Sequence, residues 1–253
     1  MAEASGLQFE RAAGLSDVAH GFFGSAGGRD QYGFGGPGDP VAIASLRARA
    51  AHAIAPGAVP VLPHQTHSSD VLTVTQAWPD EAEGRPRGDA VVTARRGLAL
   101  GVVTADCGPL LLADPSAGVI GAAHAGWRGA HGGVLAHTIA AMEALGAQRN
   151  AITAAIGPTI AQRSYEVDAA FKAHFEPREE AHFRPAPERA GKARWHFDLP
   201  GYIRAALARE RIGEIFDCAR DTYSNPERYH SYRRVSQAGE PAYGRQISLI
   251  SLG

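Results

Sequence analysis

Cysteine is nearly absent from this chain, and its scarcity limits the ways in which the fold can be held together. Only Cys107 and Cys218 occur among 253 residues, and they lie far apart in the sequence. Small secreted domains depend on several closely spaced disulfides, so the sequence excludes that class. We therefore expect a reduced, cytoplasmic protein that is stabilised by an apolar core.

Long apolar runs and an excess of one charge are also missing. The longest apolar stretch, Leu98–Ala113, is interrupted by Asp106 and Pro109 and is too short and too polar to cross a membrane. Met1–Val18 has no apolar segment behind a basic start, so we expect no secretory signal. The formal net charge of −1 argues against a dedicated face for nucleic acid.

Short apolar runs separated by Gly, Pro or Asp dominate the middle of the chain. These runs predict strands over Val71–Thr75, Ala90–Thr93, Leu98–Thr104, Pro109–Ala113, Gly118–His124, Ala151–Gly157 and Gln246–Leu252. Helical patterns are fewer and cover Val41–Ile54, Gly133–Leu145, Val167–Phe175 and Tyr202–Arg211. No linker divides the chain, so we expect one α/β (α+β) domain over residues 1–253, with mixed sheets covered by helices.

Two segments are predicted to be irregular. Gly24–Gly38 contains a literal G-x-G-x-x-G at Gly33, Gly35 and Gly38. No apolar strand precedes this motif and a proline interrupts it, so the strand–turn–helix context of a dinucleotide site is missing. Glu176–Ala193 mixes Pro, Arg and Glu and is expected to be an exposed loop, of the kind that can cover a site.

Three segments carry residues that suit a metal site. Cys107 lies in a bend between two predicted strands, where it is either a buried structural thiol or a ligand. His124 lies in a glycine-rich turn ahead of a predicted helix, and on its own it is better explained as a core histidine. His64 and His67 precede a predicted strand, and either could be a metal ligand; the alternative is that both are ordinary surface residues. Two histidines and one cysteine form a three-ligand set suited to Zn²⁺, with the fourth position open.

The strings around these residues occur together in one known family. In order, they are Gln65-x-His67, Gly88-Asp89-Ala90, Thr104-Ala105-Asp106-Cys107-x-Pro109, His124-Ala125-Gly126-Trp127-Arg128-Gly129, Ile156-Gly157-Pro158, Tyr165-Glu166-Val167, Ser231-Tyr232-Arg233-Arg234 and Gly244-Arg245. The chain thus resembles the laccase-domain family, also called the polyphenol oxidase or multicopper polyphenol oxidoreductase family. Members of that family are now regarded as purine nucleoside phosphorylases.

The resemblance implies a fold, a metal site and an activity. The fold is a layered α/β/β/α sandwich of mixed β-sheets, and the metal ligands are His67, Cys107 and His124. The cofactor is Zn²⁺, with copper as the alternative. The activities are phosphorolysis of adenosine, inosine and methylthioadenosine and deamination of adenosine, so purine nucleosides and phosphate are the expected partners. The sequence does not indicate an oligomeric state.

Further residues in the matching motifs are candidates for catalysis and substrate binding. The catalytic candidates are Cys107 and Glu166, the latter as a proton carrier. The candidates for substrate binding are Gln65, Asp106, Arg128 and Arg233. Phosphate must be held by arginines and backbone N–H groups, and Arg128 with the glycine loop is the first choice for this role.

The chain departs from the family pattern on the substrate side. Ser25 stands where an arginine is usual, the family's Ser-Leu-Asn is missing near Gly33–Gly38, and Asp221 replaces a cysteine. Arg47 and Arg29 are the candidates to replace the missing arginine. The metal ligands are all present, so we expect an intact metal site beside an altered substrate pocket.

Other functions remain open from the sequence. Cys107 could act as a nucleophile with His124 as its base, which would make a thiol hydrolase, for example an amidase acting on cell-wall precursors. Copper-dependent phenol oxidation is the third alternative, because type 1 copper also uses two histidines and a cysteine, often with an axial methionine. Methionine occurs only at Met1 and Met142, which disfavours this alternative. A module that binds metal without turnover is the last alternative.

Overall fold

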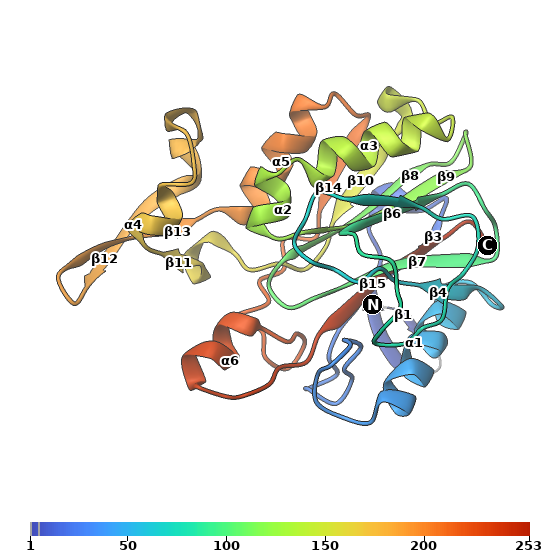
Figure 1. The fold of residues 1–253 in the computed structure, drawn as a ribbon, viewed down its shortest axis with the longest axis horizontal. Coiled ribbons are helices and arrows are strands. Elements are labelled where there is room, and N and C mark those ends of the chain that lie inside the picture. The colour runs from blue at the N-terminus through green and yellow to red at the C-terminus, as the bar shows by residue number, and fades with distance from the viewer. Residues whose placement is uncertain (1, 5) are drawn as a thin grey trace.

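Four layers of secondary structure make up the body of the computed structural model, which describes residues 2–4 and 6–253. Helices α3 (Val134–Ala144) and α5 (Leu199–Arg209) cover one sheet, a second sheet packs against its other face, and α1 (Pro40–Ile54) covers the far side of the second sheet (Figure 1). This arrangement confirms the expected α/β/β/α sandwich of mixed sheets.

The sheet under α3 and α5 carries His124 on one of its strands, and Cys107 and His67 lie just before two others. Its strand order is β14-β10-β8-β9-β6-β5. The strands are β14 (Glu214–Asp217), β10 (Thr153–Ile156), β8 (Gly108–Asp114), β9 (Val119–Ala125), β6 (Ala90–Thr93) and β5 (Val71–Thr73). The β5–β6 and β10–β14 pairs are parallel, whereas β8–β9, β6–β9 and β8–β10 are antiparallel.

The second sheet joins the two ends of the chain. Its strand order is β1-β2-β3-β15-β7-β4. The strands are β1 (Ala2–Ala4), β2 (Leu7–Glu10), β3 (Ala19–Phe23), β15 (Gln246–Ser251), β7 (Leu98–Thr104) and β4 (Val59–Val61). The C-terminal strand β15 lies between β3 and β7, and only the β4–β7 pair of this sheet is parallel within the described residues.

The central strands are continuous apolar runs because both faces of each sheet are buried. Side chains along a strand alternate between its two faces. In β8, Leu110 and Leu112 pack into the cluster with α3 and α5, whereas Leu111 packs into the cluster between the sheets. In β7, Leu100 faces the first sheet and Val103 faces α1. Full burial of each such side chain stabilises the fold by about 1.5–3 kcal/mol.

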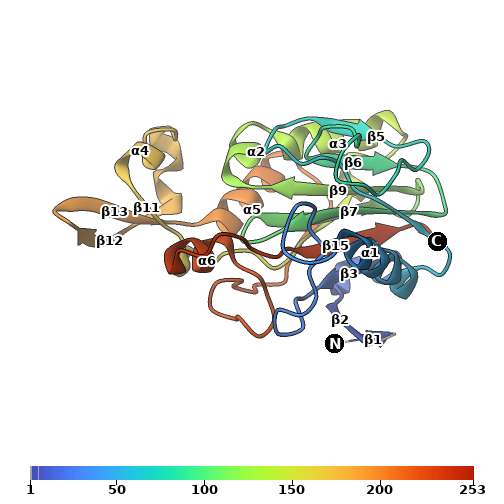
Figure 2. The same cartoon turned by 60° about the horizontal axis from the view of Figure 1, so that its bottom comes forward.

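A small third sheet forms an arm that projects from the body (Figures 1 and 2). Its order is β11-β13-β12, and α4 (Ala169–Lys172) lies next to it. The strands are β11 (Glu166–Val167), β12 (Phe183–Arg189) and β13 (Lys192–Phe197). Phe183 pairs with Phe197 across the hairpin, with ring centroids 5.0 Å apart, in an aromatic cluster that anchors the arm to the body.

The arm corrects two expectations from the sequence. Residues 176–193 are not a loop, because Pro177–His182 forms a 3₁₀ helix and 183–189 pairs with β13. The helix predicted over 167–175 is present but shorter, since α4 covers only Ala169–Lys172 and Val167 pairs with Trp195 in the sheet. The carboxylate of Asp168 accepts a hydrogen bond from Phe171 N and so begins α4 only after this strand.

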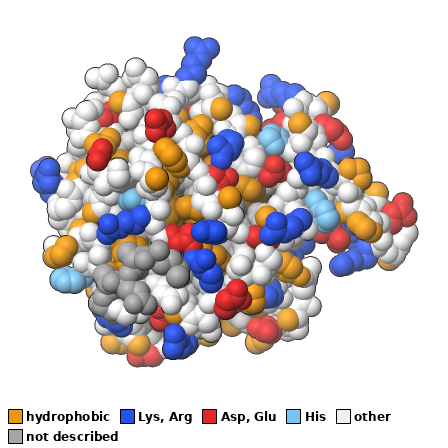
Figure 3. All heavy atoms as spheres, turned by 180° about the vertical axis from the view of Figure 1, so that it is seen from behind, with side chains coloured by type: hydrophobic (Ala, Val, Ile, Leu, Met, Phe, Trp, Pro, Cys, Tyr) orange, Lys and Arg blue, Asp and Glu red, His pale blue; other side chains and the backbone are white. Residues whose placement is uncertain are grey.

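The remaining elements are short. They are α2 (Trp127–His131), α6 (Tyr232–Ala238) and the 3₁₀ helices Ala13–Leu15, Arg149–Ala151 and Gln162–Ser164. None of the helices in the described part of the chain combines the length and the apolar character that crossing a bilayer requires. Acidic and basic side chains are interspersed on the face seen in Figure 3, as the near-neutral formal charge predicts.

Candidate metal centre

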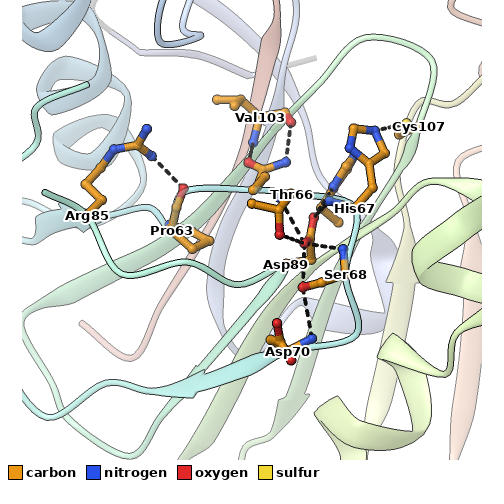
Figure 4. A network of polar contacts seen from close by, with 11 residues as sticks. Pro63, Thr66, His67, Ser68, Asp70, Arg85, Asp89, Val103 and Cys107 are labelled. Carbon is orange, nitrogen blue, oxygen red and sulfur yellow. Dashed lines mark hydrogen bonds and ion pairs between the residues drawn. The ribbon is translucent and has the colours of Figure 1, made fainter. Parts of the chain in front are cut away.

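Three segments that are distant in the sequence bring His67, Cys107 and His124 together. His124 lies in β9, Cys107 in the turn between β7 and β8, and His67 in the loop before β5. Their ligand atoms all lie within 4.8 Å of one another, and Cys107 Sγ is 3.8 Å from His67 Nε2 (Figure 4). Bond lengths of about 2.3 Å to sulfur and 2.1 Å to nitrogen place neighbouring ligands of tetrahedral zinc about 3.4–3.6 Å apart. Cys107 and His67 are already near this spacing, and the three side chains together form a group that could hold a zinc ion.

Asp89, immediately before β6, holds two of the three ligands in place. Its Oδ1 lies 2.7 Å from His124 Nδ1 and accepts a hydrogen bond of 2.9 Å from His67 N. Its Oδ2 accepts hydrogen bonds from the backbone and hydroxyl groups of Thr66 and Ser68 (Figure 4). A proton on Nδ1 of His124 leaves the Nε2 lone pair free for a metal, which is the usual role of a carboxylate behind a ligating histidine.

The electrostatic environment makes these side chains available as ligands. Burial alone would raise the pKa of Asp89, but hydrogen bonds from His124, Ser68 and Thr66 hold that pKa well below its usual range. Burial would likewise raise the pKa of the Cys107 thiol, but the adjacent imidazoles of His124 and His67 lower it to about 6. A thiolate is the form of cysteine that binds zinc.

Gly126 allows the ligands to approach one another. A Cβ atom at this position would lie 2.9 Å from His67 Cδ2 and 3.0 Å from Cys107 Sγ. Its φ of −68° suits any residue, so the requirement for glycine here comes from space alone. The glycine of the His-Ala-Gly-Trp-Arg-Gly string thus has a direct packing role at the centre.

A cavity of about 350 Å³ opens beside the ligands. Its walls include all three metal-binding candidates, together with Phe34, His64, Gln65, Arg85, Thr104, Tyr243 and Arg245. Gln65 is fixed there by two hydrogen bonds of 2.8 Å to the backbone of Val103. Within the described residues, no aspartate or glutamate lines this cavity.

A smaller cavity of about 110 Å³ also reaches Cys107. It is lined by aromatic and aliphatic side chains, with Asp106 and Arg233 at its edge. The carboxylate of Asp106 accepts hydrogen bonds from Thr222 Oγ1 at 2.6 Å, Ser231 Oγ at 2.9 Å and Arg233 N at 2.6 Å. Both of its oxygens are therefore occupied by the protein itself, which ties α6 to the turn that carries Cys107.

Two predicted site residues do not line either cavity. Arg128 is exposed, and its guanidinium lies over the ring of Trp127 at 4.7 Å. Glu166 lines a separate hollow at the base of the arm, where its carboxylate is 3.9 Å from Arg194. Arg233 lines this hollow as well as the smaller cavity, and it donates to the carbonyl oxygen of Glu166 at 2.7 Å.

The arginines that face the metal-side cavity are not those proposed from the sequence. Arg47 is paired with Asp80 at 2.8 Å, and Arg29 is exposed, with its Nε donating to the carbonyl oxygen of Ala26. Arg85 and Arg245 line the cavity instead. Asp89 was also not predicted to be a functional residue, although it lies in the Gly88-Asp89-Ala90 string. Arg85 lies in none of the matching strings, so the sequence contained no signal for it.

Within the described residues, the surroundings of the site contain no methionine that could serve as an axial ligand. Met142 is fully buried in the cluster under α3, where its sulfur packs near Gly121, and Met1 lies outside the described residues. In the part of the chain that the structure describes, one group of three or more His, Cys, Asp or Glu side chains could hold a metal. It consists of His67, Cys107 and His124.

Comparisons with known proteins identify the family of the chain. The model of the family described as multi-copper polyphenol oxidoreductase laccase matches residues 9–253. Purine nucleoside phosphorylase ORF3 of Streptomyces griseus is 52% identical over 136 residues, which are 53% of this chain and 55% of that protein. The purine nucleoside phosphorylase of Deinococcus radiodurans is 39% identical over 98% of this chain and 94% of that protein. A crystal structure of a Neisseria meningitidis protein superposes with a TM-score of 0.79 at 28% identity, covering 97% of this chain and 98% of the other. The chain belongs to the multi-copper polyphenol oxidoreductase laccase family.

Proposed function

We propose that this chain is a zinc-dependent purine nucleoside phosphorylase, with residues 1–253 as one catalytic domain. The carrying observation is a three-ligand centre that opens into a cavity of about 350 Å³ with arginine but no carboxylate in its described walls. This volume is in the range of small-molecule sites. The names of the similar Streptomyces and Deinococcus proteins support the choice of substrate. Adenosine, inosine and methylthioadenosine are the proposed nucleosides, and deamination of adenosine is a proposed second activity.

The proposed reaction makes clear demands on the protein. A phosphate oxygen bonds to the anomeric carbon as the glycosidic C–N bond breaks, and the electron pair leaves with the base, which takes up a proton. Zn²⁺ held by His67, Cys107 and His124 would supply a Lewis acid at the cavity wall. The side chains around it must hold phosphate and nucleoside in contact and exclude water, because effective catalysis of a two-substrate reaction requires fixed geometry. Gln65, fixed by the backbone of Val103, suits this positioning role.

The direct test is turnover by protein of known metal content. Metal-analysed protein is incubated with adenosine, inosine or methylthioadenosine, with and without phosphate, and the products are identified by mass spectrometry. Free base plus a sugar 1-phosphate, formed only with phosphate, supports the proposal. Cys107→Ala should lose both zinc and turnover, whereas Cys218→Ala should keep both. Zinc-loaded protein that splits none of these nucleosides would refute it, and a blue, copper-containing protein would favour the oxidase alternative.

A thiol hydrolase is a second candidate, because the same residues also form a Cys–His–Asp arrangement. Cys107 adjoins His124, whose Nδ1 lies 2.7 Å from the carboxylate of Asp89, and the Cys107 thiol has a pKa of about 6. A nucleophile, its base and an orienting carboxylate are the requirements of such an enzyme. Amidase activity that persists after zinc is removed would support this candidate, and one zinc per chain with loss of activity on chelation would exclude it.

A further inference from the structure

The cavity beside the metal ligands has an unbalanced charge. Its described walls carry two arginines, Arg85 and Arg245, and no carboxylate. Neither arginine has a carboxylate oxygen within 4.0 Å in the described part of the chain, whereas Arg47, Arg149 and Arg220 each have one. A ligand that completes these walls should therefore be negatively charged.

Arg85 is the more informative of the two because it is buried. Only 8% of its surface is exposed, and burial is the main reason why the pKa of its guanidinium falls to about 10. Arg47, its neighbour on the ring of Phe34, is similarly buried but is paired with Asp80 at 2.8 Å. A buried cation without a counter-ion is costly. The protein thus places a carboxylate in contact with one of these two adjacent arginines, whereas Asp80 acts on Arg85 only from beyond ion-pair distance.

The unused donors of these arginines match an oxyanion. Arg85 gives Nε to Glu81 O at 2.6 Å, Nη1 to Pro63 O at 2.5 Å and Nη2 to Ala82 O at 3.3 Å. A guanidinium has five N–H donors, so one on each terminal nitrogen remains. These contacts fix the plane of Arg85 (its bond to Pro63 is drawn in Figure 4) and leave two N–H groups of the guanidinium, a group that binds phosphate well.

Phe34 and Thr104 add to the same wall. The Arg85 guanidinium lies 3.4 Å from the centre of the Phe34 ring, and Arg245 Nη1 donates to Phe34 O at 3.3 Å, so one residue contacts both cations. Thr104 also lines this cavity and is 2% exposed, and its hydroxyl has no hydrogen-bond partner among the described residues. A buried hydroxyl without a partner is unfavourable. Rotation of this side chain toward a bound oxyanion would give the hydroxyl an acceptor.

The geometry points to Arg85 and Arg245 as the oxyanion subsite of the metal cavity, with Thr104 as an additional donor. This inference deepens the proposed function, on which its assignment to phosphate rests. The shared chemistry is a tetrahedral phosphate group. Its source is either inorganic phosphate as a co-substrate or the phosphate ester of a nucleotide. Arg128, which was the choice from the sequence, does not line this cavity and is not part of the subsite.

The test measures binding directly, in addition to turnover. Zinc-loaded wild type, Arg85→Met, Arg245→Met and Thr104→Val are titrated calorimetrically with inorganic phosphate and, separately, with adenosine 5′-monophosphate, with zinc content measured in each sample. Arg87→Met is the matched control, because Arg87 is exposed in the same loop and does not line the cavity. We expect loss of either arginine to weaken binding at least ~10-fold, as for a lost charge-assisted hydrogen bond. Arg87→Met should bind as the wild type does.

The outcomes separate the subsite from the proposed function. If phosphate is the co-substrate, Arg85→Met raises the KM for phosphate and leaves the KM for the nucleoside unchanged. If the ester is bound, only binding of the nucleotide falls in the variants. Arginine-dependent binding by a wild type that splits no nucleoside would support the subsite and refute the proposed function. Equal affinities across all variants would overturn the subsite even if phosphorolysis occurs. Arg85→Lys and Arg245→Met carry the test if Arg85→Met does not fold.

Discussion

Replacement of Asp89 by asparagine should separate the metal site from the rest of the fold. This change keeps the size of the side chain and removes the negative charge that orients His124 and His67. The carboxylate is fully buried and accepts bonds from both histidines on Oδ1 and from Thr66 and Ser68 on Oδ2. An amide offers one oxygen and one NH₂ group. Either the donors of the two histidines or those of Thr66 and Ser68 must therefore face the NH₂ group of the asparagine.

The less costly orientation places the NH₂ group toward the histidines. It then donates to Nδ1 of His124, which forces the ring proton onto Nε2 and removes the lone pair that the metal needs. It also leaves His67 N without an acceptor, since that backbone group now faces a donor. Loss of such a supporting carboxylate typically lowers metal affinity about 10–100-fold. Each buried donor left without a partner costs about 1–3 kcal/mol, so the metal-free protein should be destabilised as well.

The assay is competition for zinc with a chromophoric chelator, together with urea unfolding of the metal-free protein. Asp114→Asn is the matched control, because Asp114 is also fully buried and accepts hydrogen bonds from Ser116, Ala117 and Gln148 far from the metal ligands. The control should lose stability and keep its zinc affinity. If Asp89→Asn binds zinc as the wild type does, Asp89 does not set the tautomer of His124 and the reasoning fails.

Three further predictions use the same assays. Gly126→Ala should weaken zinc binding, because the new methyl group would overlap His67 and Cys107; unchanged affinity would mean that the ligands can separate without loss. Cys107→Ala should abolish stoichiometric zinc by metal analysis, whereas Cys218→Ala should retain it; zinc bound equally by both variants would remove Cys107 from the ligand set. Burial would raise the pKa of Asp114, but its hydrogen bonds hold it below the ordinary value, so its stabilising effect exists above the unfolded pKa of about 3.9 and disappears as the pH falls. The difference in unfolding free energy between wild type and Asp114→Asn should therefore be about 1–3 kcal/mol at neutral pH and shrink below about pH 4, and a constant difference would contradict this account.

The core strands could be predicted because burial on both faces leaves a local mark in the sequence. The runs over 90–93 and 98–104 match β6 and β7 at both ends, and the helix over 41–54 begins only one residue late. The arm could not be predicted in this way. Its strand β12 carries Pro185 and Pro187 and is mostly exposed, and its pairing comes from β13 rather than from its own apolar pattern. Arg233 lies in the first turn of α6, where the Ser231 hydroxyl accepts a hydrogen bond from Arg234 N and caps the helix.

The sequence by itself determined the fold class and the identity of the three candidate ligands. Buried sheets require long apolar runs, and the family model matches residues 9–253, which include His67, Cys107 and His124. Only the tertiary structure decided which charged groups meet at the cavity. Arg85, Arg245 and Phe34 come from three segments that no local pattern connects, and a guanidinium looks the same in the sequence whether a carboxylate neutralises it or not. Pairing is a property of the folded chain, so the assignment of Arg47 to Asp80 and of Arg85 to the cavity required the structure.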